Sequence, residues 1–149
     1  MRHVTWLWVV LLGVLGCSGD FTSKALGVKY EPPKGMGLRA EEPGVARFEG
    51  GLELRSVRGT PPSLEATPDV VLGAAGLPVP GRVVQASKGT LPAGPVARYE
   101  LTGGGARTLV YFVPGKERFV LVTFSAPERD YGALSSRVEL SLSTLKLLD

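Results

Sequence analysis

The stretch ARYELTGGGARTLVYFVPGKERFVLVTFSAP, residues 97–127, decides the fold of this chain. Two of its runs, 106–113 and 118–125, are rich in apolar and β-branched residues on both alternating faces. Such strands lie centrally in a sheet and are covered on both sides. Pro114 and Gly115 stand between the two runs and begin a turn. We therefore predict an antiparallel pair of strands at the centre of a sheet.

The residues just before this pair supply a third strand. The run PVARYELTGGG, residues 95–105, alternates between apolar and polar side chains and ends in three glycines that suit a hairpin turn. One face of the predicted strand carries Ala97, Tyr99 and Leu101, and the other carries Arg98, Glu100 and Thr102. The three strands together predict an antiparallel meander.

Shorter strands are expected upstream of the meander. Residues 45–59 read as a hairpin that turns at Gly50 and Gly51. Its inward side chains would be Phe48, Leu52 and Leu54, and its outward side chains Glu53 and Arg55. Residues 26–35 predict a short strand broken by the pair Pro32-Pro33, and residues 82–87 predict a weaker strand.

Two helices are predicted. The first covers 68–76, with Thr67 as N-cap and Pro68 as its first residue. The second covers 127–146, opened by a proline and loaded with acidic residues in its first turn. Its apolar stripe, at three- and four-residue steps, is Tyr131, Leu134, Val138, Leu142 and Leu145. The predicted fold class is therefore α+β, an antiparallel sheet flanked by helices.

The N-terminal residues indicate export. The chain of 149 residues is best explained as one domain behind a targeting segment. Arg2 precedes an apolar run over 6–16, and the run is followed by the only cysteine, Cys17. A basic start, a short apolar run and a small residue before the cleavage point are typical of a secretory signal peptide. A membrane-spanning helix, which needs about 20 apolar residues, is the less favoured alternative.

The position of Cys17 points to a particular kind of signal peptide. The residues Val14-Leu15-Gly16-Cys17 resemble the lipobox of bacterial lipoproteins, although Val14 and Leu15 depart from its preferred residues. The resemblance implies that residues 1–16 are removed, that Cys17 is acylated, and that residues 17–25 tether the domain, with structure starting near Leu26. The alternative is an ordinary signal peptide cleaved after Gly19. By the same resemblance Ser18 favours the periplasmic face of the outer membrane.

The layout of the chain resembles that of the PsbP-like family. The shared features are LGVKYEPPKGM (26–36), the following hairpin, a small helix before the meander, and a last helix that ends in LSTLKLL (142–148). Met36 departs from the tryptophan that family members often carry. The resemblance implies an α/β/α domain over 26–149, a binding or assembly role, and no catalytic residues.

The sequence offers little that could perform catalysis. Its one histidine is His3 and its one cysteine is Cys17, so a processed chain has no His-based triad, thiol nucleophile or Cys/His metal site. Ser143 and Lys146 match Ser-x-x-Lys in letters only, and the pairs Glu41-Glu42 and Glu128/Asp130 are best explained as solvated surface. We expect no catalytic residue, no cofactor and no metal. Basic residues are scattered, so nucleic-acid binding is not expected.

Three functions remain open from the sequence. The first is a non-enzymatic, lipid-anchored envelope lipoprotein that meets the membrane through its lipid and a protein partner through its surface. The second is a carrier or sensor of a small apolar ligand, held between helix and sheet. The third is a hydrolase that acts through Ser143 or through carboxylates. The loops at 73–81 and 89–95 are expected to be connectors rather than contact surfaces.

Overall fold

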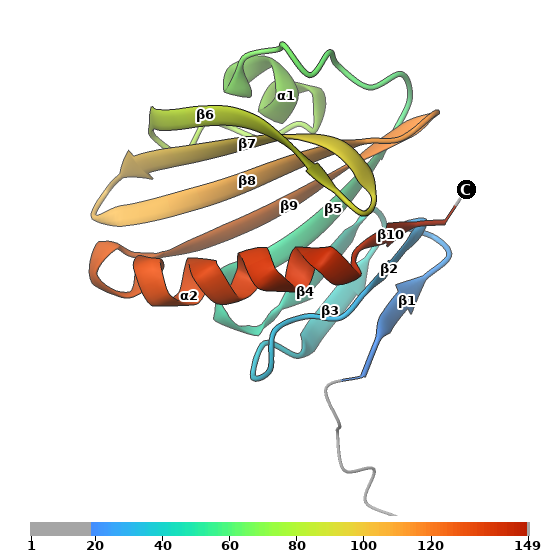
Figure 1. Ribbon diagram of the computed structural model, residues 1–149, viewed down its shortest axis with the longest axis horizontal. Coiled ribbons are helices and arrows are strands. Elements are labelled where there is room, and N and C mark those ends of the chain that lie inside the picture. Colours follow the sequence, from blue (N-terminus) through green and yellow to red (C-terminus); the bar gives the residue numbers. More distant parts are fainter. Residues whose placement is uncertain (1–18, 149) are drawn as a thin grey trace, which may run out of the picture.

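The computed structural model describes residues 19–148. A seven-stranded sheet in the order β3-β4-β5-β9-β8-β7-β6, antiparallel throughout, forms the centre of the molecule (Figure 1). Its strands are β3 (Leu38–Glu42), β4 (Val45–Phe48), β5 (Leu52–Arg58), β6 (Arg82–Leu91), β7 (Gly94–Gly103), β8 (Ala106–Pro114) and β9 (Arg118–Pro127). A second sheet, in the order β1-β2-β10, contains β1 (Phe21–Ser23), β2 (Val28–Tyr30) and β10 (Lys146–Leu147).

The predicted meander is confirmed as β7, β8 and β9. Tyr111 of β8 lies opposite Val122 of β9, and Tyr99 of β7 lies opposite Val110 of β8. Neighbouring residues on β8, such as Val110 and Tyr111, are both buried although they point to opposite faces. The two apolar strands are therefore covered on both sides, as their composition predicted.

Helices cover the two faces of the large sheet. On one face, α1 (Pro68–Ala74) packs Val71 and Leu72 against the meander. On the other face lie α2 (Glu128–Ser141) and the small sheet, where Val138 and Tyr30 are buried in a second cluster (Figure 1). This arrangement confirms the predicted antiparallel sheet flanked by helices.

The second predicted helix is wrong at its C-terminal end. It was expected to run to residue 146, but α2 stops at Ser141 and a 3-10 turn, Leu142–Thr144, follows. The hydroxyls of Ser141 and Thr144 donate to the carbonyl oxygens of Val138 and Ser141, which competes with helix continuation. Leu145 is extended, and the chain then joins β2 as β10. The first helix ends at Ala74 rather than residue 76.

The expected start of structure near Leu26 is also wrong. Strand β1 begins at Phe21, and the Phe21 side chain is 8% exposed within the core. Antiparallel pairing of Phe21 with Tyr30 and of Ser23 with Val28 gives the strand one buried face. The boundary between tether and domain, expected after residue 25, therefore lies inside the folded unit.

The hairpin prediction is confirmed, and two further strands were not predicted. Strands β4 and β5 flank a 3-10 turn over Glu49–Gly51, with Phe48, Leu52 and Leu54 buried. Strand β3 escaped prediction because all of its residues are exposed and three of the five are charged. Strand β10 has only two residues. Strand β6 extends to Leu91 rather than residue 87.

Candidate functional site

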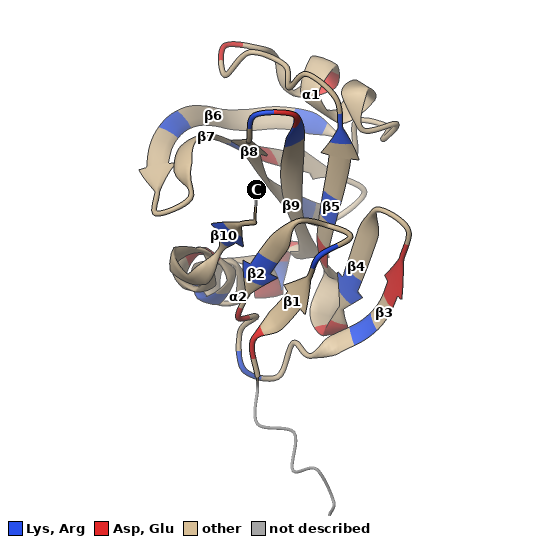
Figure 2. Cartoon of the chain, turned by 90° about the vertical axis from the view of Figure 1, so that its right-hand side faces the viewer, with Lys and Arg blue, Asp and Glu red and all other residues tan. Residues whose placement is uncertain are grey.

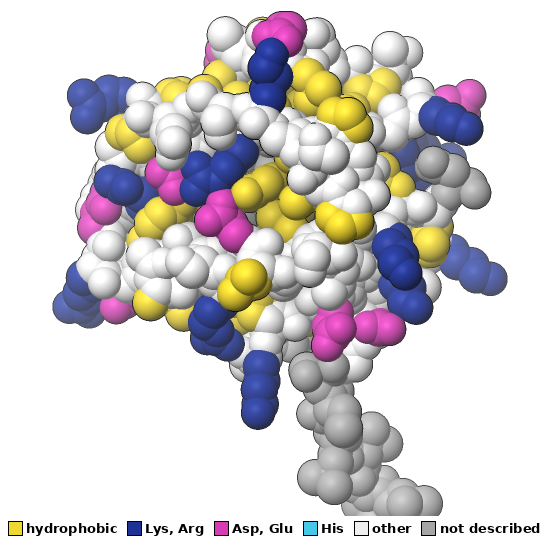
Figure 3. Space-filling view, in the orientation of Figure 1, with side chains coloured by type: hydrophobic (Ala, Val, Ile, Leu, Met, Phe, Trp, Pro, Cys, Tyr) yellow, Lys and Arg dark blue, Asp and Glu magenta, His cyan; other side chains and the backbone are white. Residues whose placement is uncertain are grey.

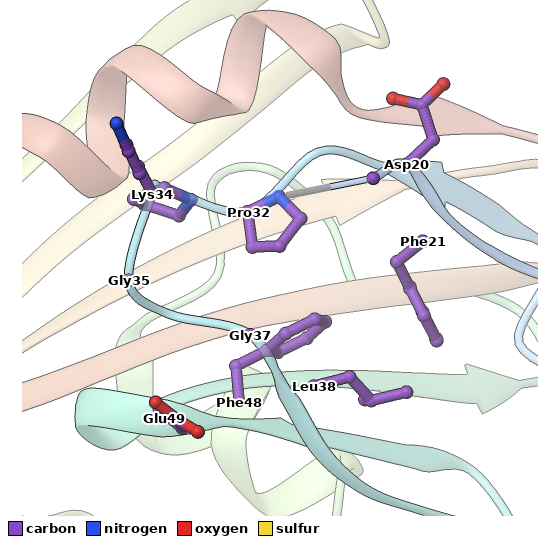
Figure 4. Close-up of a pocket in the computed structure, with 11 residues that line it drawn as sticks. Asp20, Phe21, Pro32, Lys34, Gly35, Gly37, Leu38, Phe48 and Glu49 are labelled. Carbon is purple, nitrogen blue, oxygen red and sulfur yellow. The ribbon is translucent and has the colours of Figure 1, made fainter. Parts of the chain in front are cut away.

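An open groove lies where the described chain begins. Its volume is about 840 Å³, and it is formed by the start of β1, the segment between β2 and β3, and the turn after β4 (Figure 4). The residues that line it are Gly19, Asp20, Phe21, Pro32, Pro33, Lys34, Gly35, Gly37, Leu38, Phe48 and Glu49. We call it the N-terminal groove.

Prolines and glycines shape one wall of this groove. Pro32 and Pro33 end β2, because a proline cannot donate to a strand ladder. The Met36 amide donates to the Pro33 carbonyl at 2.9 Å, which closes a turn through Gly35 at a φ of 86°. Downstream, the Glu49 amide donates to the Gly37 carbonyl at 2.9 Å and ties this wall to the hairpin.

The floor of the groove is aromatic. Phe21 and Phe48 meet edge to face with ring centroids 5.4 Å apart, and Tyr30 meets Phe48 in the same way at 5.9 Å. These contacts hold the rings in fixed positions. Leu38 lies beside them and is 46% exposed, which is unusual for a leucine next to a core (Figure 4). Phe21 and Phe48 are themselves only 8% and 3% exposed, so Leu38 is the side chain of the floor that a ligand or partner could cover.

Charged groups stand at the rim of the groove. Asp20 lies 3.5 Å from Lys29, Glu49 and Lys34 flank the opening, and Arg137 of α2 donates to the Lys34 carbonyl. Figure 2 shows basic and acidic positions interspersed over the strands around this end of the molecule. The rim can orient a polar group, whereas the floor can bind an apolar one.

The groove lies close in sequence to Cys17. Asp20 is three positions after Cys17 in the chain, so their Cα atoms are at most about 11 Å apart. Cys17 itself lies outside the described residues, as do the predicted cleavage site and the rest of residues 1–18. Any group attached at Cys17 would therefore sit near the groove.

Apart from the N-terminal groove, a cluster of charged residues and tyrosines lies between the large sheet and α2. The Arg98 guanidinium donates to the Glu139 carboxylate at 2.5 Å and to the Glu100 carboxylate at 2.7 Å. Tyr111 donates to Glu139 at 2.7 Å and Tyr131 donates to Glu100 at 2.8 Å. Figure 3 shows acidic and basic side chains together in a hollow at the centre of this face. The sequence pattern placed Arg98 and Glu100 on one face of β7, and the structure shows that this face is beneath α2 rather than in open solvent.

Protonation in this cluster is fixed by its hydrogen bonds. Burial alone would raise the pKa of Glu100, but the donors Tyr131 and Arg98 outweigh it and lower that pKa below its ordinary value. Burial alone would lower the pKa of Arg98, yet the carboxylates of Glu139 and Glu100 raise it. Burial and the Glu139 carboxylate raise the pKa of Tyr111 to about 12. Arg98 and Glu100 are thus held in their charged forms and Tyr111 in its neutral form, which suits a structural contact better than proton transfer.

The other sequence-predicted residues do not assemble into a reactive site. The Ser143 hydroxyl donates to the Leu140 carbonyl at 3.0 Å. Lys146 is separated from it by the extended Leu145 and pairs with Lys29 in the small sheet, so the two are not on one helical face.

The carboxylate pairs also serve local contacts. Glu41 accepts from Ser23 at 2.5 Å, and Glu42 pairs with Arg47 at 2.7 Å. Glu128 accepts from Thr102 at 2.7 Å at the start of α2. Within residues 19–148 no group of three or more His, Cys, Asp or Glu side chains could hold a metal ion, and no helix is long and apolar enough to cross a membrane.

Sequence reasoning missed the residues that make the N-terminal groove. Phe21 was assigned to a tether, and Leu38 was assigned to no element. In the sequence Phe21-Thr22-Ser23 is one apolar residue followed by two polar ones, so nothing in it alternates, although the strand buries its first and third residues. The Pro32-Pro33 turn and the inward side chain of Phe48 were identified from the sequence, but not that they meet.

No family model matches the chain, and no curated protein matches it in sequence. Solved structures do match its fold. The solution structure of the cyanobacterial PsbP protein CyanoP from Synechocystis sp. PCC 6803 matches with a TM-score of 0.57 at 15% identity, over 91% of this chain and 96% of that one. A crystal structure from Bacteroides thetaiotaomicron VPI-5482 matches with a TM-score of 0.60 at 12% identity, over 89% of this chain. This chain spans only 50% of the Bacteroides protein. The chain therefore has the PsbP-like fold.

Proposed function

We propose that this chain is a lipid-anchored envelope protein of the PsbP-like family that acts as a non-enzymatic interaction or assembly module. Acylated at Cys17, it would be held at the membrane, on the periplasmic face of the outer membrane. The N-terminal groove would be the surface at which it meets a protein partner.

One observation carries this proposal: an exposed groove begins two residues after the predicted lipid attachment point, at Gly19. An anchor at Cys17 would restrict the groove to the neighbourhood of the bilayer, because the connecting chain reaches only about 11 Å. The exposed Leu38 and the aromatic floor give a partner apolar surface to bury. The Ser143 region and the carboxylate pairs supply no competing catalytic arrangement.

The experiment compares the wild-type protein with Cys17→Ser and Leu38→Asp in the native host. We expect Cys17→Ser to move the protein out of the membrane fraction. We expect Leu38→Asp to remain in the membrane but to lose the cross-link that a photoreactive residue at position 34 forms in the wild-type background. A Cys17→Ser protein that fractionates like the wild type would contradict the anchor. An unchanged cross-link in Leu38→Asp would contradict the groove as the contact surface.

A second candidate function is the transport or sensing of a small apolar ligand. The aromatic floor formed by Phe21 and Phe48, with charged groups only at the rim, favours it. Native mass spectrometry of gently purified protein should then show an added mass that Leu38→Asp lowers. A single unliganded mass for the wild type would contradict this alternative.

A further inference from the structure

Strand β6 is a long and open edge of the large sheet. It has ten residues, and the first nine are exposed. It pairs only with β7, so alternate residues direct their N–H and C=O groups away from the sheet. In the described part of the chain, no backbone hydrogen bond from another segment reaches these outward groups. The strand therefore offers an unpaired hydrogen-bonding edge.

Neither helical layer covers this edge. The cluster around α1 contains buried residues of β7, β8 and β9, and the cluster beneath α2 also lacks a buried β6 residue. Only Leu91, at the end of β6, packs partly against the core. In Figure 1 the strand runs along the upper border of the sheet, below α1.

The opposite edge of the large sheet, β3, has features that discourage the addition of another strand. Strand β3 has five residues, ends in Glu41 and Glu42, is followed by Pro43, and has a register shift between Leu38 and Ala40. Short length, charge, proline and irregularity all discourage strand addition. Strand β6 has one irregularity, between Val83 and Gln85, and continues regularly from there to Leu91 without proline.

A small hollow lies beside the regular part of β6. Its volume is about 100 Å³, and Ser87 and Gly89 of β6 leave it open above Val96 and Tyr111. Arg98 also lines it, but its guanidinium already donates to Glu139, Gln85 and Glu100. An added strand could therefore place one small apolar side chain over the hollow, as side-chain pockets do in strand-addition complexes.

The charge of β6 favours one kind of added strand over another. The charged residues of β6 are Arg82 and Lys88, both basic. Arg82 is in no ion pair within residues 19–148, and Lys88 pairs only with the exposed Glu65. A second copy paired through its own β6 would bring four β6 cations together, with Glu65 of each copy beside Lys88 as the one paired carboxylate. An acidic segment would instead complement both residues.

From these observations we infer that β6 is a docking edge for an extended, acidic segment of a partner protein, which adds as an eighth strand of the sheet. Main-chain hydrogen bonds would supply most of the affinity, and the hollow beside Ser87 and Gly89 would favour a small apolar residue. The inference rests on the proposed role as an interaction module but not on the lipid at Cys17.

The test uses full-length protein in detergent and three synthetic peptides. The first is acetyl-Glu-Val-Thr-Val-Thr-Val-Glu-amide. The second has alternate amides N-methylated, which removes one hydrogen-bonding edge. The third has lysine in place of both glutamates. Amide hydrogen exchange at β6, read by NMR, measures binding. We expect the acidic peptide to slow exchange of the outward β6 amides at least about tenfold, and the other two to have little effect.

Variants then separate charge from general binding. Arg82→Glu combined with Lys88→Glu should weaken the acidic peptide about tenfold and allow the lysine peptide to bind. Lys24→Glu, an exposed charge reversal in the turn between β1 and β2, is the matched control and should change neither. Exchange at β7 and β8 amides reports that each variant is folded.

Three results would overturn the inference: no β6 protection by the acidic peptide, equal protection by the N-methylated peptide, or concentration-dependent β6 protection without any peptide. The last would assign the edge to a second copy. Loss of membrane binding in Cys17→Ser tests the anchor separately and leaves these results unaffected.

Discussion

The guanidinium of Arg98 in β7 donates to the carboxylate of Glu139 in α2, with Nε 2.5 Å from Oε1. The same guanidinium binds Glu100 at 2.7 Å, and the side chains of Arg98 and Glu100 are only 19% and 13% exposed. Two carboxylates thus share one cation beneath the helix. We call these contacts of Arg98 with Glu100 and Glu139 the latch. The latch holds α2, and with it the following strand β10, against the large sheet.

Removal of Arg98 should destabilise the fold. Arg98→Met leaves Glu100 and Glu139 half-buried without their cation, at an expected cost of about 1–3 kcal/mol in the free energy of unfolding. Lys88→Met, which breaks the exposed pair with Glu65, should cost less than about 0.5 kcal/mol. Urea unfolding at neutral pH measures both. Equal costs for the two variants would show that Arg98 does not latch the helix.

Acid should weaken this latch through Glu100. The folded protein lowers the pKa of Glu100 below its ordinary 4.5. The ionised form is therefore favoured on folding, and its contribution is present above pH 4.5 and lost as pH falls through the folded pKa. The urea midpoint should fall as the pH drops below about 4.5, less steeply in Glu100→Gln than in the wild type. Parallel curves for the two proteins would contradict this assignment.

Alkali should act through the tyrosines. Burial raises the pKa of Tyr30 and of Tyr111 from 10.0 to about 12, and the pKa values of Tyr99 and Tyr131 are also raised. The neutral form is favoured on folding, so this stability is complete below pH 10 and is lost as pH rises towards 12. Near-ultraviolet absorbance should show much less tyrosinate near pH 10 than four free tyrosines would give while the protein stays folded. A normal titration there would contradict the burial of these hydroxyls.

Gly51 tests how closely the hairpin approaches β9. It has a φ of 83°, and a Cβ there would lie 2.5 Å from the Ser125 carbonyl oxygen. Gly35 has a similar φ of 86° but open space around it. Gly35→Ala should cost about 1–2 kcal/mol from backbone strain alone. Gly51→Ala should cost a further 1–3 kcal/mol or so from the steric clash. Equal losses in thermal unfolding would show that the hairpin can move away from β9.

Substitutions in the N-terminal groove should show which residues stabilise the fold and which serve only to contact a partner. Leu38→Asp should change the free energy of unfolding by no more than about 0.5 kcal/mol, because the side chain is 46% exposed. Phe48→Ala should cost about 3–5 kcal/mol, because Phe48 is buried between two aromatic rings. Val79→Asp, at a residue 43% exposed in the loop after α1, is the control that should affect neither stability nor the cross-link near Lys34.

The central fold was predictable because two independent signals in residues 97–127 agree. Runs 106–113 and 118–125 are apolar, and turn residues stand between them. What failed depends on long-range contacts. Phe21 is ordered by pairing with Tyr30, and Leu145 leaves the helix because β10 joins β2. Neither pairing can be read from the neighbouring residues, although the hydroxyls of Ser141 and Thr144 locally favour an end of the helix.

The candidate site was less predictable than the fold for the same reason. The N-terminal groove brings together residues from 19 to 49, and the sequence indicates only the Pro32-Pro33 turn and the inward side chain of Phe48. The contacts between Arg98 and Glu139 join residues 41 positions apart. Alternation placed Arg98 and Glu100 on one face of β7, but it could not show that a helix covers that face.

The most direct test of the account is the intact mass of the protein extracted from membranes. We predict a chain that begins at Cys17 and carries the added mass of a diacylglycerol group and an amide-linked fatty acid. An unacylated chain that begins at Asp20 or retains the leading residues would contradict the lipid anchor on which the proposed function depends.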